Sequence, residues 1–108
     1  MLRLYSDVRD WQSDARRLYS QIVGHDRSLA DQLRRSAQSV ALNVGEGMGA
    51  CGGVRRNCYR IALREARECG VAIETAQAWG YVGDVEASVL DRLDKIRATL
   101  FRLTSPKS

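Results

Sequence analysis

The chain has 108 residues, of which 44% are hydrophobic, 28% are charged and only 6% are aromatic, and its formal net charge is +4. This is the usual length of one domain, and the low aromatic content and single proline favour helices over an all-β core. The sequence predicts neither a membrane span nor a signal peptide, because no apolar run approaches the length that either requires. We therefore expect a cytoplasmic location.

The first two helices are predicted from apolar residues that recur at steps of three and four. One is expected over residues 6–23, where Asp and Arg side chains fill the opposite face and Gly24 ends the helix. The next is expected over residues 29–44, with Ser28 as its N-cap. It should end in a loop over residues 45–53, because five glycines in nine residues disfavour a helix.

The last two helices are expected over residues 54–79 and 84–103, with Asp84 as the N-cap of the fourth. Gly70 lies in the middle of the third helix, where glycine costs about 1 kcal/mol relative to alanine. It therefore indicates a close helix crossing or a bend. Four amphipathic helices with short connections predict an all-α protein, an antiparallel up-down-up-down four-helix bundle in a single domain over residues 1–108.

Aromatic residues could stack nucleic-acid bases, but they more often anchor a core or a subunit contact. Trp11 and Tyr59 fall on the apolar faces, so we expect them in the core. Trp79 and Tyr81 follow the third helix, so we expect them at an end of the bundle or at an interface.

No catalytic, metal or cofactor site is predicted. The three cysteines are odd in number and fit no zinc spacing, so reduced thiols are expected, two of them in the core. His25 lies in a turn and has no obvious serine or cysteine partner in the sequence, and no carboxylate is expected on an apolar face. Residues 47–52 have the G-x-G-x-x-G spacing of dinucleotide-binding loops. They follow a predicted helix rather than a strand, which argues against a dinucleotide site. We therefore expect a protein that is not an enzyme.

Arginines on one face of the third helix form the candidate nucleic-acid-binding site. Residues 54–67 carry five arginines and one glutamate, a net charge of +4 that equals the charge of the whole chain. Guanidinium groups suit phosphate because they donate hydrogen bonds in a planar fork. Four of these arginines, spaced four, four and three residues apart, define what we call the arginine stripe: Arg56, Arg60, Arg64 and Arg67. Arg55 lies beside the stripe in sequence and is included in the candidate site.

The alternative for the arginine stripe is a solvated face, or pairing with acids of a neighbouring helix, namely Glu86, Asp91 or Asp94. Arg34 and Arg35 in the second helix could extend the basic surface, or could pair with Asp31 or Glu46. Asn43 and Glu46 could hold a ligand, although a structural role at the helix end is favoured.

The segment of residues 32–47, QLRRSAQSVALNVGEG, resembles the central stretch of a known family: an Arg-Arg pair, a Ser-Val and then Asn-x-x-Glu-Gly. Trp11 and the Gly80-Tyr81 pair fit the same family, called four-helix bundle proteins. It includes ribosomal RNA intervening-sequence proteins and the accessory variability determinant of diversity-generating retroelements. The resemblance implies a homo-oligomer, a pentamer in known members, and an adaptor that associates with a reverse transcriptase and with nucleic acid.

The leading functional hypothesis is a homo-oligomeric adaptor that binds RNA or DNA through its basic face, together with a protein partner such as a reverse transcriptase. The alternative is a self-assembling helical scaffold that recognises only protein. Small residues in the third helix support this alternative, because they allow a partner backbone to approach: Ala62, Ala66, Gly70, Ala72 and Ala76.

Overall fold

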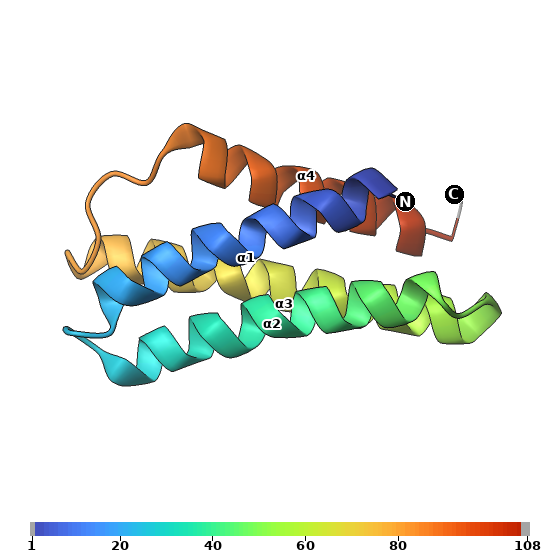
Figure 1. Ribbon diagram of the computed structural model, residues 1–108, viewed down its shortest axis with the longest axis horizontal. Coiled ribbons are helices and arrows are strands. Elements are labelled where there is room, and N and C mark those ends of the chain that lie inside the picture. The colour runs from blue at the N-terminus through green and yellow to red at the C-terminus, as the bar shows by residue number, and fades with distance from the viewer. Residues whose placement is uncertain (1, 107–108) are drawn as a thin grey trace.

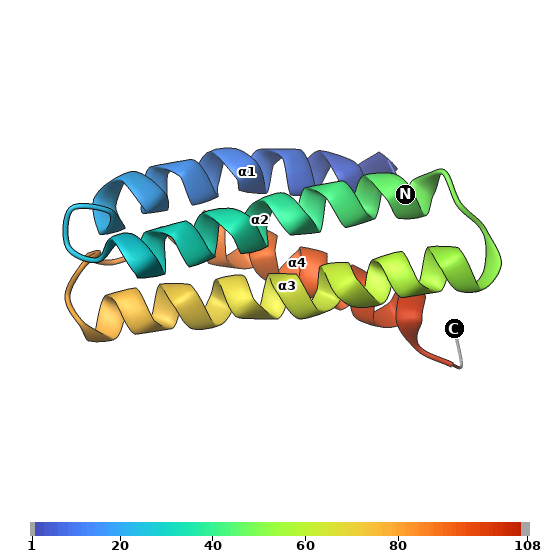
Figure 2. The ribbon, with the colours of Figure 1, turned by 90° about the horizontal axis from the view of Figure 1, so that it is seen from below.

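The computed structural model describes residues 2–106 as four helices, with no strand in this range. The helices are α1 (Leu2–Ile22), α2 (Arg27–Met48), α3 (Gly52–Ala78) and α4 (Ala87–Thr104). Each packs against its neighbours in sequence, and α4 also contacts α1, which closes a ring of four helices measuring 42 × 24 × 21 Å. Neighbouring helices run in opposite directions (Figures 1 and 2). The predicted antiparallel four-helix bundle is confirmed.

The two ends of the bundle differ. One end holds the turn between α1 and α2 together with the connection from α3 to α4, and the other holds the turn between α2 and α3 and both ends of the described chain (Figures 1 and 2). No helix among the described residues is both long enough and apolar enough to cross a membrane.

The helix boundaries depart most from expectation at the glycine-rich stretch, residues 45–53. The connection lies within the predicted range, but its predicted length is wrong, because α2 continues to Met48 and α3 starts at Gly52. Gly47 is buried within α2 and lies directly against the ring of Tyr59 from α3. Packing of α2 on α3 therefore outweighs the low helix propensity of these glycines.

Two predicted caps also differ. Asp26, rather than Ser28, caps α2, since its carboxylate accepts a hydrogen bond from the backbone N–H of Leu29 at 2.9 Å. The N-cap position of α4 is held by Glu86, two residues after the predicted Asp84, and it makes no side-chain cap bond. Asp and Ser favour an N-cap almost equally, so the sequence could not decide between Asp26 and Ser28.

The core runs along the whole bundle and receives one apolar face from each helix. Trp11 and Tyr59 are its largest fully buried side chains, as predicted. α1 starts four residues earlier than expected, because Leu4 extends its buried face. Other members of the core include Val8, Leu18, Ile22, Leu33, Val40, Val44, Ile73, Leu93, Ile96 and Leu100.

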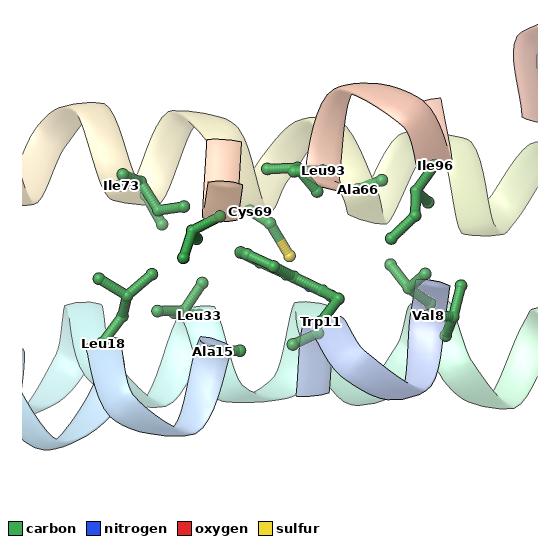
Figure 3. Packing of buried hydrophobic residues seen from close by; sticks show 14 of the residues in the cluster. Val8, Trp11, Ala15, Leu18, Leu33, Ala66, Cys69, Ile73, Leu93 and Ile96 are labelled. Atoms are coloured by element: carbon green, nitrogen blue, oxygen red, sulfur yellow. The ribbon is translucent and has the colours of Figure 1, made fainter. Parts of the chain in front are cut away.

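All three cysteines are free, and the expected placement of two of them inside the protein is confirmed. Cys58 and Cys69 are buried, whereas Cys51 is exposed. Figure 3 shows Trp11 reaching across the core toward Cys69. Burial raises the pKa of Cys69 to about 12, although contact with the Trp11 indole works in the opposite direction. The Cys69 thiol is therefore protonated at neutral pH and acts as a small apolar filler.

Candidate nucleic-acid interface

The arginine stripe occupies the outer face of the N-terminal half of α3. The same helix turns Tyr59, Leu63 and Ala66 into the core, and the helical period of 3.6 residues then places the arginines toward solvent. At 1.5 Å per residue the stripe is about 16 Å long. All four of its side chains are exposed: Arg56, Arg60, Arg64 and Arg67.

Acidic side chains do little to neutralise the arginine stripe. Within the described residues, its one ion pair joins Nη2 of Arg64 to Oε2 of Glu65 at 3.8 Å. No pair within 4.0 Å links the stripe to α4 in that part of the chain, because Asp94 pairs with Arg97 of its own helix. Arg97 lies across Gly70, where an added Cβ would be 2.6 Å from Nη1 of Arg97. Gly70 therefore makes room for an arginine of α4.

Arg55 is set apart from the arginine stripe by its contacts. Its Nε donates a hydrogen bond to the backbone carbonyl of Gly47 at 3.1 Å, which ties the first turn of α3 to the last turn of α2. The same carbonyl, in the last turn of α2, also accepts a hydrogen bond from the backbone N–H of Ala50 at 3.2 Å. Arg55 thus stabilises the α2–α3 turn, and because its side chain is also exposed, its place in the binding surface stays a prediction.

Arg34 and Arg35 do not extend the arginine stripe directly. Nη2 of Arg34 lies 3.8 Å from Oδ1 of Asp31, which is one of the two partners considered for it. Arg35 lines a groove of about 270 Å³ between α2 and α3, where Glu65 and Glu68 line the α3 side. Arg35 therefore shares its groove with two acids and with none of the arginines of the stripe.

Asn43 and Glu46, the amide and acid of the Asn-x-x-Glu-Gly stretch, make local contacts. Nδ2 of Asn43 donates to the carbonyl and the hydroxyl of Ser39, at 2.9 and 3.2 Å, within α2. Oε2 of Glu46 accepts a long contact from the Cys58 thiol at 3.8 Å. Both sets of contacts favour the structural role over a ligand site.

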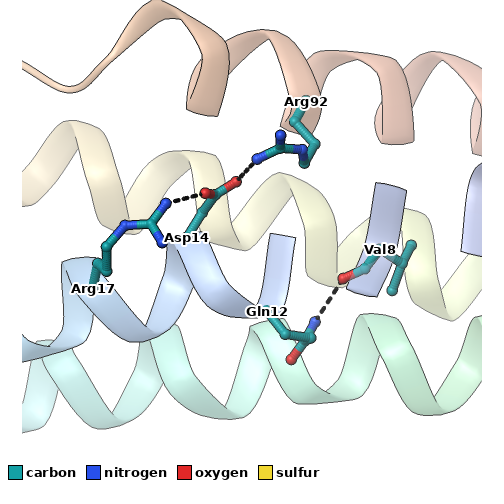
Figure 4. Close-up of polar contacts among 5 residues, drawn as sticks. All are labelled: Val8, Gln12, Asp14, Arg17 and Arg92. Atoms are coloured by element: carbon teal, nitrogen blue, oxygen red, sulfur yellow. Dashed lines mark hydrogen bonds and ion pairs between the residues drawn. The ribbon is translucent and has the colours of Figure 1, made fainter. Parts of the chain in front are cut away.

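A buried ionic cluster joins α1 to α4, where no carboxylate was expected on an apolar face. Asp14 is only 2% exposed and accepts hydrogen bonds from Arg17 and Arg92 (Figure 4). The hydrogen bond to Asp14 raises the pKa of Arg92 above its ordinary value. The sequence did hold a signal, because Asp14 lies three residues after Trp11 and four before Leu18, on the face that both bury.

The groove between α1 and α2 lacks the groups that acid–base catalysis needs. This groove of about 460 Å³ is lined by Tyr19, Ser20 and Arg34 among others, but by no histidine or carboxylate that could act as a base. Among residues 2–106, no three His, Cys, Asp or Glu side chains cluster closely enough to hold a metal ion.

Aromatic side chains gather at the end of the bundle formed by the α1–α2 turn and the α3–α4 connection. Tyr81 stacks on His25, and Trp79 stacks on Tyr81. Tyr81 is half-buried against the core, whereas Trp79 is exposed. The predicted position of Trp79 and Tyr81 at a bundle end is confirmed.

Comparison with known proteins places this fold in a family. The chain is similar to a protein of unknown function from the S23 ribosomal protein family of Bacteroides thetaiotaomicron, whose crystal structure superposes with a TM-score of 0.84. The two share 21% sequence identity over 94% of this chain and 98% of that chain, which shows the fold. A search of curated proteins finds no match. A family model described as 23S rRNA-intervening sequence protein matches residues 2–102, so the chain belongs to that family.

Proposed function

We propose that the protein is a non-enzymatic, cytoplasmic adaptor that binds RNA or DNA through the arginine stripe. One observation carries the proposal: four exposed arginines lie on one helix face, and three of them, Arg56, Arg60 and Arg67, make no ion pair with any acid among the described residues. Like charges four residues apart repel each other and weaken a helix slightly, so the stripe does not stabilise the fold. Its positive charge instead favours binding of an anionic partner.

The dimensions of the arginine stripe fit a phosphate backbone. Its length of about 16 Å corresponds to the axial rise of about five base pairs of duplex, at 3.4 Å per nucleotide of one strand. Arginine contacts to phosphate fix position without reading bases, so binding should depend strongly on salt and only weakly on sequence.

Oligomerisation would strengthen this surface. The family resemblance supports a homopentamer, in which each subunit would repeat the arginine stripe and add to the positive potential. The family name refers to 23S rRNA, which supports a nucleic-acid context. A protein partner such as a reverse transcriptase is part of the same proposal.

A scaffold that recognises only protein is the second candidate. Exposed apolar side chains on three helices favour it: Leu42, Val71 and Phe101. The small residues that supported it in the sequence are instead enclosed by the bundle, since Ala62, Ala66, Ala72 and Ala76 are all buried. They pack α3 within its own subunit, so the scaffold hypothesis loses that support.

The combined Arg56→Gln, Arg60→Gln and Arg64→Gln variant is expected to bind a labelled single-stranded RNA or DNA about 10- to 100-fold more weakly at low salt. This corresponds to about 0.5–1 kcal/mol for each of the phosphate-binding arginines that the variant replaces. Fluorescence anisotropy measures the affinity directly.

The matched control for this variant removes three exposed arginines of α1: Arg3→Gln, Arg9→Gln and Arg16→Gln. It changes the net charge by the same amount, and we expect a much smaller loss of affinity. Equal losses in the two variants would mean that total charge, rather than the arginine stripe, governs binding. Unchanged binding in the α3 variant would show that the stripe is not the site.

A further inference from the structure

Three rings from two separate connections form a continuous stack at one end of the bundle, and we call them the aromatic stack: His25, Tyr81 and Trp79. The ring centroids of His25 and Tyr81 are 5.2 Å apart with an interplanar angle of 13°. Those of Trp79 and Tyr81 are 6.4 Å apart with an angle of 22°. The three rings are therefore close to parallel, and Tyr81 pairs with each of the other two.

The backbone holds the aromatic stack in place. Gly80 adopts φ +74°, a left-handed conformation that turns the chain between Trp79 and Tyr81. The N–H of Tyr81 then donates to the carbonyl of Ala76 at 2.8 Å, and Val82 is buried in the core. The backbone thus positions Tyr81 before any partner arrives, which lowers the entropic cost of binding.

Trp79 presents most of its indole to solvent. It is 71% exposed, whereas the other tryptophan, Trp11, is 0% exposed. A tryptophan ring that is mostly in water and pairs with Tyr81 adds little to core packing, so its removal should cost the fold little stability. Its free surface is suited to a flat aromatic partner.

We propose that the aromatic stack binds an unpaired nucleobase of the same strand whose phosphates contact the arginine stripe, a proposal that rests on the proposed function. Base stacking on aromatic rings tolerates any sequence because every base has a π-face. Trp79 lies twelve residues beyond Arg67, about 18 Å along the axis of α3, so a few nucleotides of one strand span the gap. Asp84 and Glu86 in the same connection disfavour phosphate there, which leaves a base as the fitting group.

The test compares two probes: an eight- to ten-nucleotide single strand, and an abasic strand with the same number of phosphates. Trp79→Ala is expected to weaken binding of the base-bearing strand about 5- to 100-fold and to leave binding of the abasic strand unchanged. Trp79→Phe should retain much of the affinity because it keeps a ring. In the unmodified protein the base-bearing strand should quench tryptophan emission, and Trp79 is the accessible fluorophore.

Phe101→Ala is the matched control, since it removes another exposed aromatic ring, from α4. It should leave both affinities unchanged. The proposal is overturned if Trp79→Ala weakens both strands equally or neither, or if it alters the oligomeric state while affinity stays the same, which would assign Trp79 to a subunit contact. If the base-binding proposal fails, salt-dependent binding of the abasic strand would still support phosphate binding by the arginine stripe. Failure of both strands to bind the protein would contradict both proposals.

Discussion

Replacing Gly47 with alanine is expected to destabilise the protein by about 1–2 kcal/mol. An added Cβ would lie 2.4 Å from Cε1 and 2.9 Å from Cδ1 of the Tyr59 ring. Tyr59 is only 1% exposed, so its ring is held by the core on its other sides and has little room to retreat. Overpacking of this kind typically costs about 1–3 kcal/mol, which exceeds the gain in helix propensity. Urea unfolding followed by circular dichroism measures the change.

Gly45→Ala is the matched control for this prediction. It lies in the same helix two residues earlier and is exposed, and an added Cβ would meet nothing within 4 Å. Alanine there should stabilise the protein by up to about 1 kcal/mol. The two variants should therefore move stability in opposite directions. If Gly47→Ala also stabilised the protein, the close contact with Tyr59 would not govern this part of α2.

Replacing Arg92 with methionine is expected to cost about 2–3 kcal/mol of stability. The change leaves the Asp14 carboxylate, which is 2% exposed, without its partner on α4. Loss of one member of a buried pair typically costs about 3–5 kcal/mol, and the value here should be lower because Arg17 still contacts Asp14. Thermal or urea unfolding of the variant tests this, with the helical signal as readout.

Two further variants separate the ionic interaction from simple packing. Arg17→Met should cost less than about 1 kcal/mol, because that side chain is 60% exposed. Adding Asp14→Leu to Arg92→Met should restore much of the stability, because the two apolar side chains would then leave no unpaired charge in the core. If the double variant were less stable than Arg92→Met alone, the cost would lie in packing rather than in the unpaired carboxylate.

Helical periodicity in the sequence was enough to predict the bundle and most of its core. Steps of three and four residues depend only on helix geometry, which is why Trp11, Tyr59 and the exposed arginine stripe fall where expected. The extension of α2 through residues 45–48 was not predictable in this way. It depends on Tyr59 lying against Gly47, a contact between positions twelve residues apart that local propensity does not represent.

Polar contacts likewise divide into those that residue spacing could predict and those that depend on the folded structure. Burial of Asp14 follows from its place on the apolar face of α1, so closer attention to spacing would have found the residue but not its partner Arg92 on α4. The role of Arg55 could not be read from its charge, because its bond to Gly47 exists only in the tight α2–α3 turn. The His25–Tyr81 contact likewise joins two connections that the sequence places 56 residues apart.

Contact between the arginine stripe and phosphate is tested most directly by the salt dependence of nucleic-acid binding. The affinity of the purified protein for a labelled single-stranded RNA and a matching DNA should be measured by fluorescence anisotropy from low to near-physiological salt. Four arginine contacts predict that the logarithm of the binding constant falls linearly with the logarithm of salt concentration, with a slope of about −3 for a single strand. A slope near zero, or no binding of either strand at low salt, would contradict a phosphate-binding role.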